Sequence, residues 1–186
     1  LFSIFILFIG TSMIPCLSGS VVDDRHSFFE KILTFTTPPT PIRNVAEFEP
    51  MEAVLIRYPF GITYELIAEL SEDVEVVTIV ANINQQNYVY NQYQNHGVNV
   101  NHCSFLIALS NTYWTRDYGP WFVFTGNNEL AVIDFSFYGY GNYYPNDNNI
   151  PSAFAIDQGF PQYLMPLYHE GGNYMTDGHR ISASTD

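Results

Sequence analysis

Residues 113–121 place a carboxylate, a guanidinium and two indoles in one short stretch beside a Gly-Pro pair. Asp117 directly follows Arg116, and Trp114 and Trp121 lie on either side of it. A carboxylate held at a turn suits a bidentate pair with a guanidinium ligand, because two parallel N–H donors match its two oxygens. Indoles beside it can cover the flat face of the cation and exclude water. The stretch therefore predicts a site for a planar cation, with Asp117 as the anchor and Trp114 as a wall.

A second pattern, Glu-Gly-Gly-Asn at residues 170–173, follows further along the chain. Paired glycines let the backbone pass close to another segment and adopt unusual dihedral angles, so Glu170 can lie at the floor of a pocket. Each pattern also has a simpler explanation. Asp117 can cap a turn or pair with Arg116, and the two glycines can form a turn between strands. Spacing alone leaves both explanations open.

Composition excludes several classes of protein. The 186 residues are 47% hydrophobic and only 13% charged, which favours a folded domain over disorder. The net charge is −13, from six Lys and Arg against nineteen Asp and Glu. A negative field of this size repels nucleic acid and anionic lipid and favours cationic ligands, although an acidic surface also serves solubility. We therefore expect no nucleic-acid partner and no stable membrane contact in the folded part.

The cysteines and histidines suggest neither a disulfide framework nor a metal centre. Cys16 and Cys103 are the two cysteines, and the histidines show no metal-ligand spacing, so we expect no metal and no cofactor. His102 precedes Cys103, but neighbours on a strand point to opposite faces. Since Cys103 begins an apolar run, we expect a buried structural thiol rather than a nucleophile.

The first residues are typical of a targeting segment. Residues 1–20 combine an apolar run with small residues after it, as in a secretory signal peptide. We therefore expect secretion, with an uncleaved membrane anchor as the alternative. Residues 21–40 are polar and Pro-containing and predict a linker.

The remaining chain, 41–186, alternates strand and helix patterns, which indicates an α/β fold of small repeated units. Short apolar, β-branched runs predict buried strands, and apolar residues at helical spacing predict helices. Thr63 is expected as an N-cap, and Pro151 at the first position of a helix. The expected strands are 53–58, 74–80, 98–109, 121–124, 130–137 and 180–184; the helices are 63–70, 84–95 and 150–159; and 138–149 is expected as a loop.

These motifs carry a resemblance to a known family. The stretches 114–120 (WTRDYGP) and 170–178 (EGGNYMTDG), with 46–50 and 53–59 at the start of the domain, are similar to the agmatine deiminases and porphyromonas-type peptidylarginine deiminases. The resemblance runs from about residue 41 to 186. It implies a pentein fold, a pseudo-fivefold α/β propeller, of which this chain holds about the first half.

The resemblance also implies an activity, the hydrolysis of a guanidinium to a ureido group with release of ammonia. Asp117 then corresponds to a guanidinium-binding carboxylate, Trp114 lines the pocket, and Glu170 matches a Glu that supports the catalytic His. The family's His-x-Asp pair and nucleophilic Cys are expected after residue 186, so the 186 residues alone should be inactive.

The substrate stays open between peptidyl-arginine and agmatine. The stretch 172–178 and the leader favour the peptidyl branch, whereas 138–149 contains no Arg to hold a peptide carboxylate. Two other classes fit the composition. The acidic charge and aromatic residues would also suit a non-catalytic binder of cationic or arginine-containing peptides, and the Tyr- and Asn-rich composition an extracellular structural protein.

Overall fold

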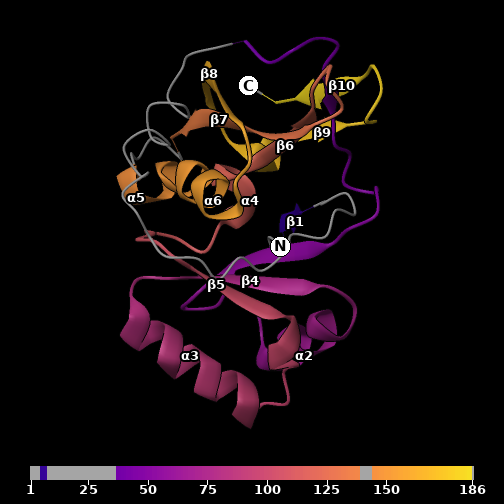
Figure 1. Cartoon of the computed structure of the whole chain (residues 1–186). Coiled ribbons are helices and arrows are strands. Elements are labelled where there is room, and N and C mark those ends of the chain that lie inside the picture. Colours follow the sequence, from indigo (N-terminus) through magenta and orange to yellow (C-terminus); the bar gives the residue numbers. More distant parts are fainter. Residues whose placement is uncertain (1–4, 8–36, 139–143, 186) are drawn as a thin grey trace, which may run out of the picture.

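The computed structural model describes residues 5–7, 37–138 and 144–185. They form two four-stranded sheets and a separate hairpin (Figure 1). The predicted leader, 1–20, and linker, 21–40, lie outside the described residues except for 5–7 and 37–40. Residues 5–7 form strand β1 (Phe5–Leu7), which pairs antiparallel with β3 (Ala53–Arg57). Among the helices that the structure describes, none has the length and apolar character needed to span a bilayer.

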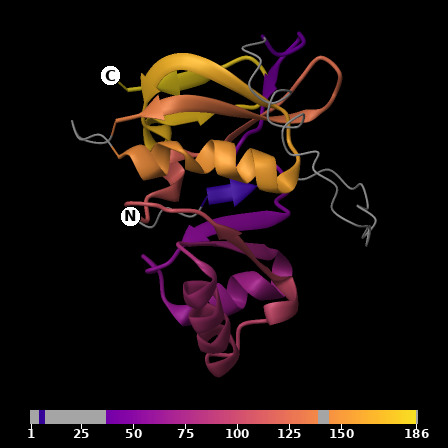
Figure 2. The same cartoon turned by 60° about the vertical axis from the view of Figure 1, so that its left-hand side comes forward.

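The first sheet is built from two β-α-β units. β3 (Ala53–Arg57), β4 (Glu75–Val80) and β5 (Cys103–Ile107) run parallel, in the order β1-β3-β4-β5. α2 (Tyr64–Asp73) and α3 (Ile83–Asn95) connect them. Because a parallel pair needs a crossover, each helix packs back on the sheet, and Figures 1 and 2 show both on the same face.

The helix boundaries follow from local chemistry. The Thr63 side chain accepts a hydrogen bond from the Leu66 N–H at 3.4 Å, which confirms it as the N-cap of α2. α3 ends at Asn95 and is followed by the C-cap His96 and by Gly97, which has a φ of 74°. The expected strand 98–109 is shorter than predicted, because residues Val100–His102 form a 3-10 turn, η1, before β5.

The second sheet is mixed, in the order β2-β6-β7-β8. The predicted antiparallel pair across residues 125–128 is confirmed. The helix predicted at 150–159 is confirmed as well, with Pro151 in its first turn and Gly159 at its end. The strands are β2 (Arg43–Asn44), β6 (Trp121–Phe124), β7 (Leu130–Phe137) and β8 (Gln162–His169), the helix is α6 (Ile150–Gln158), and the hairpin is β9 (Tyr174–Thr176) with β10 (Ser182–Ser184).

The loop expected at 138–149 is wrong in part. Residues 139–143 lie outside the described residues, but Pro145–Asn148 form a helical turn, α5. Pro145 stands at its first position, where a missing N–H costs nothing. The Asn-rich composition suggested a loop because Asn and Asp favour turns, and here they hydrogen-bond other segments instead.

Helices and sheets alternate in layers. α2 and α3 cover one face of the first sheet, and α6 with a short helix near residue 117 lies between the two sheets (Figures 1 and 2). One buried cluster joins the inner faces of both sheets to α6, and a second joins the first sheet to α2 and α3. The α/β prediction is confirmed, and the described residues close no barrel. The outer face of the second sheet carries a groove.

Candidate functional site

Asp117, which was predicted to be held at a turn, lies in a single helical turn. α4 (Thr115–Tyr118) begins after Trp114 and ends at Gly119, whose φ is 86°. Thr115 and Tyr118 are buried, so they fix the turn between the two sheets. The two residues between them, Arg116 and Asp117, are half-buried and face away from the core. The local fold therefore presents one cation and one carboxylate at the rim of the core.

The two predicted motifs meet at Asp117. Residues Gly171–Asn173 form a 3-10 turn, η3, directly after Glu170. The Gly172 N–H donates a hydrogen bond to Asp117 Oδ1 at 3.2 Å. A Cβ on Gly172 would stand 2.3 Å from that oxygen, and one on Gly171 would stand 2.3 Å from the Arg116 carbonyl oxygen. Close approach to α4 thus explains why both positions are glycine.

The surroundings of Asp117 disfavour the ionised form of its carboxyl. Burial raises the pKa of its carboxyl, and the negative charge of Glu170 raises it further. The Gly172 N–H and the Arg116 guanidinium act in the opposite direction and are the weaker influences. The site therefore brings two acidic side chains, one from each motif, close enough to repel each other.

The cation beside Asp117 is engaged elsewhere. The Arg116 guanidinium forms an ion pair with Glu47 and donates to the Tyr174 carbonyl oxygen at 3.0 Å. It also lies over the indole of Trp121, 5.5 Å from the ring centroid. Glu47 was not predicted as part of the site; residues 46–50 were noted only for the family resemblance.

The two indoles have different surroundings. Trp114 is half-buried, and its ring lies 4.8 Å from that of Tyr113. Trp121 packs against Tyr174, with ring centroids 4.6 Å apart, and contacts the chain's own Arg116. The structure therefore places Trp121 as support for Arg116, and Trp114 is left as the indole predicted to line the cation site.

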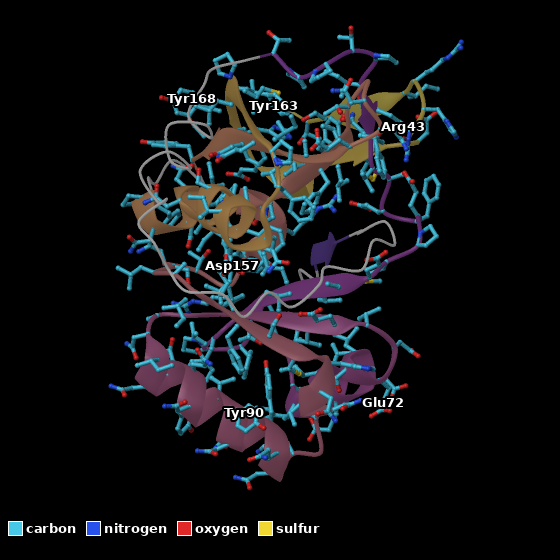
Figure 3. All side chains as sticks on the ribbon, in the orientation of Figure 1. Arg43, Glu72, Tyr90, Asp157, Tyr163 and Tyr168 are labelled. Carbon is cyan, nitrogen blue, oxygen red and sulfur yellow. The ribbon has the colours of Figure 1, made fainter. Side chains whose placement is uncertain are left out.

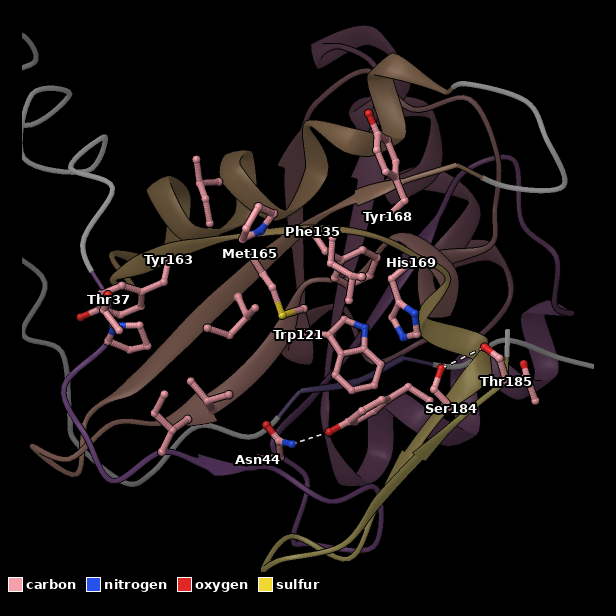
Figure 4. A pocket seen from close by; sticks show the side chains of 18 residues that line it. Thr37, Asn44, Trp121, Phe135, Tyr163, Met165, Tyr168, His169, Ser184 and Thr185 are labelled. Atoms are coloured by element: carbon pink, nitrogen blue, oxygen red, sulfur yellow. Dashed lines mark hydrogen bonds between the residues drawn. The ribbon is translucent and has the colours of Figure 1, made fainter.

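Behind Trp121, a groove of about 890 Å³ hollows the outer face of the second sheet (Figure 4). Its wall is mainly apolar and aromatic, and Tyr163 and Tyr168 of β8, which Figure 3 labels, are among its lining residues. The Trp121 Nε1 and His169 Nε2 atoms are buried without a hydrogen bond, and burial lowers the pKa of His169. The lining includes neither Asp117 nor Glu170, so the groove is separate from the carboxylate pair.

Cys103 and the metal-ligand residues were the remaining chemical candidates. The Cys103 thiol contacts the Asn99 carbonyl oxygen at 3.4 Å, and burial raises its pKa to about 11. His102 instead pairs through Nδ1 with the Ser71 carbonyl oxygen at 2.8 Å. These contacts agree with a structural thiol. Within the part of the chain that the structure describes, no three His, Cys, Asp or Glu side chains gather as metal ligands.

Known proteins resemble this chain in sequence and in fold. The family model described as Porphyromonas-type peptidyl-arginine deiminase matches residues 43–186. A putative agmatine deiminase of Shewanella baltica is 32% identical over 84 residues, which are 41% of this chain and 23% of that protein. A second putative agmatine deiminase, from a Shewanella strain, is 30% identical over 91 residues, 45% of this chain and 25% of the relative.

Two solved structures share the fold. The agmatine deiminase of C. jejuni matches with a TM-score of 0.62 at 17% identity, over 76% of this chain and 45% of that chain. The putative arginine deiminase of Porphyromonas gingivalis matches with a TM-score of 0.62 at 18% identity, over 74% of this chain and 45% of that chain. The chain thus spans less than half the length of these proteins. Because the family model covers most of the chain, including both motifs that meet at Asp117, the chain belongs to the Porphyromonas-type peptidyl-arginine deiminase family.

Proposed function

We propose that residues 41–186 form the guanidinium-binding half of a deiminase that hydrolyses a guanidinium to a ureido group and releases ammonia. The observation that carries the proposal is the hydrogen bond from the Gly172 N–H to Asp117, which joins the two motifs beside Glu170. Membership of the family supports the reaction class. The relatives' names support two substrates, peptidyl-arginine and agmatine, and both stay in the proposal.

In this proposal Asp117 binds the cation. A guanidinium carbon is a poor electrophile because its positive charge is delocalised over three nitrogens. Hydrogen bonds to a carboxylate fix the group in position and hold it within reach of a nucleophile. Trp114 covers the flat face of the guanidinium, and Glu170 supports the proton-transferring His. We assign that His and the nucleophilic Cys to a part of the domain that these 186 residues do not contain, since the chain covers 45% of the solved structures it resembles.

The electrostatics of Asp117 give the proposal a pH dependence. Its pKa is raised, so the carboxylate is the form that becomes scarce as pH falls. A guanidinium stays positively charged at every pH at which the Asp117 carboxyl titrates, and it pairs strongly only with the ionised carboxylate. Binding should therefore strengthen as pH rises through the raised pKa and then level off.

Calorimetry with agmatine and with an N-acetylated arginine amide tests the proposal. Asp117→Asn should weaken binding of both about 10- to 150-fold, because a charge-assisted hydrogen bond contributes about 1.5–3 kcal/mol. Asp157→Asn, an exposed carboxylate on α6, is the matched control and should bind as the parent does. Equal affinity of the parent and Asp117→Asn would show that this residue is not the anchor.

Turnover separates an enzyme from a non-catalytic binder. The 186 residues should release no ammonia from either compound. A longer protein that also supplies the His and the Cys should do so, and should lose this activity in Asp117→Asn. Saturable binding without turnover in the longer protein would instead favour a binder of arginine-containing peptides. We also propose that the protein is secreted through residues 1–20, which the intact mass of the exported form would test.

A further inference from the structure

Asp147 is a buried carboxylate that the proposed chemistry does not use. It lies in α5, in the segment expected to be a loop, and its side chain is fully buried. Both of its oxygens accept hydrogen bonds from the loop that leads into α4. Oδ1 accepts from the Asn111 N–H at 2.6 Å, and Oδ2 accepts from the Thr112 N–H at 3.1 Å and its hydroxyl at 2.8 Å.

The Thr112 hydroxyl extends this contact to the candidate site. It donates to Asp147 and accepts from the Trp114 N–H at 3.4 Å. The carbonyl oxygen of Thr112 accepts from the Tyr118 hydroxyl at 3.3 Å. Trp114 and Tyr118 stand at the two ends of α4, which carries Asp117 between them. One residue, Thr112, thus connects Asp147 to both ends of the helical turn.

Both α5, which carries Asp147, and the loop that it contacts are held by further hydrogen bonds. The Asn148 side chain pairs with both backbone groups of Phe137 at the end of β7, accepting from N–H at 2.6 Å and donating to the carbonyl oxygen at 3.1 Å. Asn111 Oδ1 accepts from the Asn146 N–H at 3.1 Å, so loop and helix hold each other reciprocally. From the first sheet, Arg57 donates to the Ser110 hydroxyl and carbonyl oxygens at 2.8 and 3.0 Å.

A carboxylate at this position has a physical reason. Burying a charge is costly unless hydrogen bonds satisfy it, and this loop offers two backbone N–H groups and a hydroxyl at the same point. An apolar side chain would leave all three donors without an acceptor in a position that water does not reach. An amide has a single acceptor oxygen, and its NH₂ group would face one of the donors.

We propose that Asp147 is a positioning residue for the cation site, which holds residues 110–113 and thereby places Trp114 and α4. The proposal about Trp114 stands on the hydrogen bonds alone, whereas its effect on a ligand rests on the proposed function. Asp147 itself does not touch the cation. It acts through Thr112, and its loss should loosen the indole and displace Asp117.

The fluorescence of Trp114 can report whether its indole is held in place, because the chain contains two tryptophans and one of them can be replaced. Trp121→Phe removes the other one without breaking a hydrogen bond, since the Trp121 Nε1 atom has none. In this background we would compare Asp147→Asn and Thr112→Val with the matched control Asp134→Asn. Asp134 is another buried carboxylate, but its partners are Ser152 and Gln162, away from the loop.

Acrylamide quenching and fluorescence anisotropy would be measured on chains whose far-UV circular dichroism matches the parent. In Asp147→Asn, quenching of Trp114 should rise toward its value in the urea-unfolded chain, and the anisotropy should fall. Thr112→Val should shift both in the same direction by less, and Asp134→Asn should shift neither. Should Asp147→Asn fail to fold, Thr112→Val decides the question, because it removes the hydroxyl and keeps the side-chain volume.

Agmatine affinity, measured on the same proteins, should fall about tenfold in Asp147→Asn, equivalent to ~1.4 kcal/mol. Unchanged quenching and anisotropy in the folded Asp147→Asn and Thr112→Val chains would overturn the proposal, as would an equal shift in Asp134→Asn. Absence of agmatine binding in the parent would count against the proposed function, while the fluorescence would still decide whether Asp147 positions Trp114.

Discussion

Replacing Gly171 by Ala should unfold the chain at a lower temperature, for a reason visible in the structure. The new Cβ would stand 2.3 Å from the Arg116 carbonyl oxygen and 2.5 Å from Trp121 Nε1. The backbone of Gly171 has no positive φ, so the cost is steric and not conformational. One obstacle is backbone of α4, which buried Thr115 and Tyr118 hold in place, and the other is an indole packed on Tyr174.

The size of the effect follows from overpacking. Forcing an extra methyl group into a packed region costs about 1–3 kcal/mol. For a chain of this length, each kcal/mol lowers the melting temperature by about 2–4 °C, so we expect a decrease of about 2–12 °C. Thermal unfolding followed by far-UV circular dichroism measures it.

Substitutions at two other glycines separate the causes. In Gly172→Ala the Cβ would meet Asp117 Oδ1 at 2.3 Å, which is the end of a side chain and can rotate away. This variant should melt near the parent but bind agmatine more weakly, because the carboxylate is displaced. Gly159→Ala has no atom within 4 Å of its Cβ but a φ of 73°, so it measures conformational strain alone, about 1 kcal/mol. The steric reasoning would be refuted by a Gly171→Ala chain that melts with the parent, or by a larger loss in Gly172→Ala.

Two further predictions concern buried polar groups. Burial raises the pKa of the Asp134 carboxyl from 3.8 to about 6, so the folded chain keeps this proton longer than the unfolded chain does. Stability should therefore fall by about 3 kcal/mol as pH rises from about 4 to about 6, and urea unfolding of Asp134→Asn should lack this part of the slope; identical slopes would contradict it. The buried Tyr93 hydroxyl lies 2.6 Å from the Thr78 hydroxyl, so Tyr93→Phe should cost about 1–3 kcal/mol in urea unfolding, whereas the exposed Tyr90→Phe should cost nothing measurable.

The elements that the sequence predicted well are those fixed by local chemistry. β3 and β4 are apolar runs buried on both faces, and α2 begins at the Thr63 cap. A buried parallel strand and a capped helix each leave a signal within a few residues of themselves. The strand expected at 98–109 was too long because apolar character alone does not show where the 3-10 turn η1 gives way to β5.

The sequence singled out the residues of the candidate site but not the residues that hold them in position. Asp117 and Glu170 stood out by their neighbours, and the paired glycines pointed to a close approach that α4 provides. Glu47 and Asp147 left no such signal, because each acts on a segment distant in sequence. A carboxylate in a Tyr- and Asn-rich stretch is typical of a loop, and only the tertiary contacts show that Asp147 accepts from Asn111 and Thr112.

The arrangement of charges around Asp117 favours a cation site over a structural ion pair. In a structural pair, Arg116 would direct its guanidinium to Asp117 and hold the pKa of that carboxyl down. Here the guanidinium is directed to Glu47 and the Tyr174 carbonyl oxygen, and the pKa of Asp117 is raised by burial and by Glu170. A half-buried carboxylate in this state costs free energy that an incoming cation would recover, since pairing restores the ionised form. The chain thus directs its own neighbouring guanidinium to Glu47 and to the Tyr174 carbonyl oxygen, which leaves Asp117 available to a guanidinium ligand.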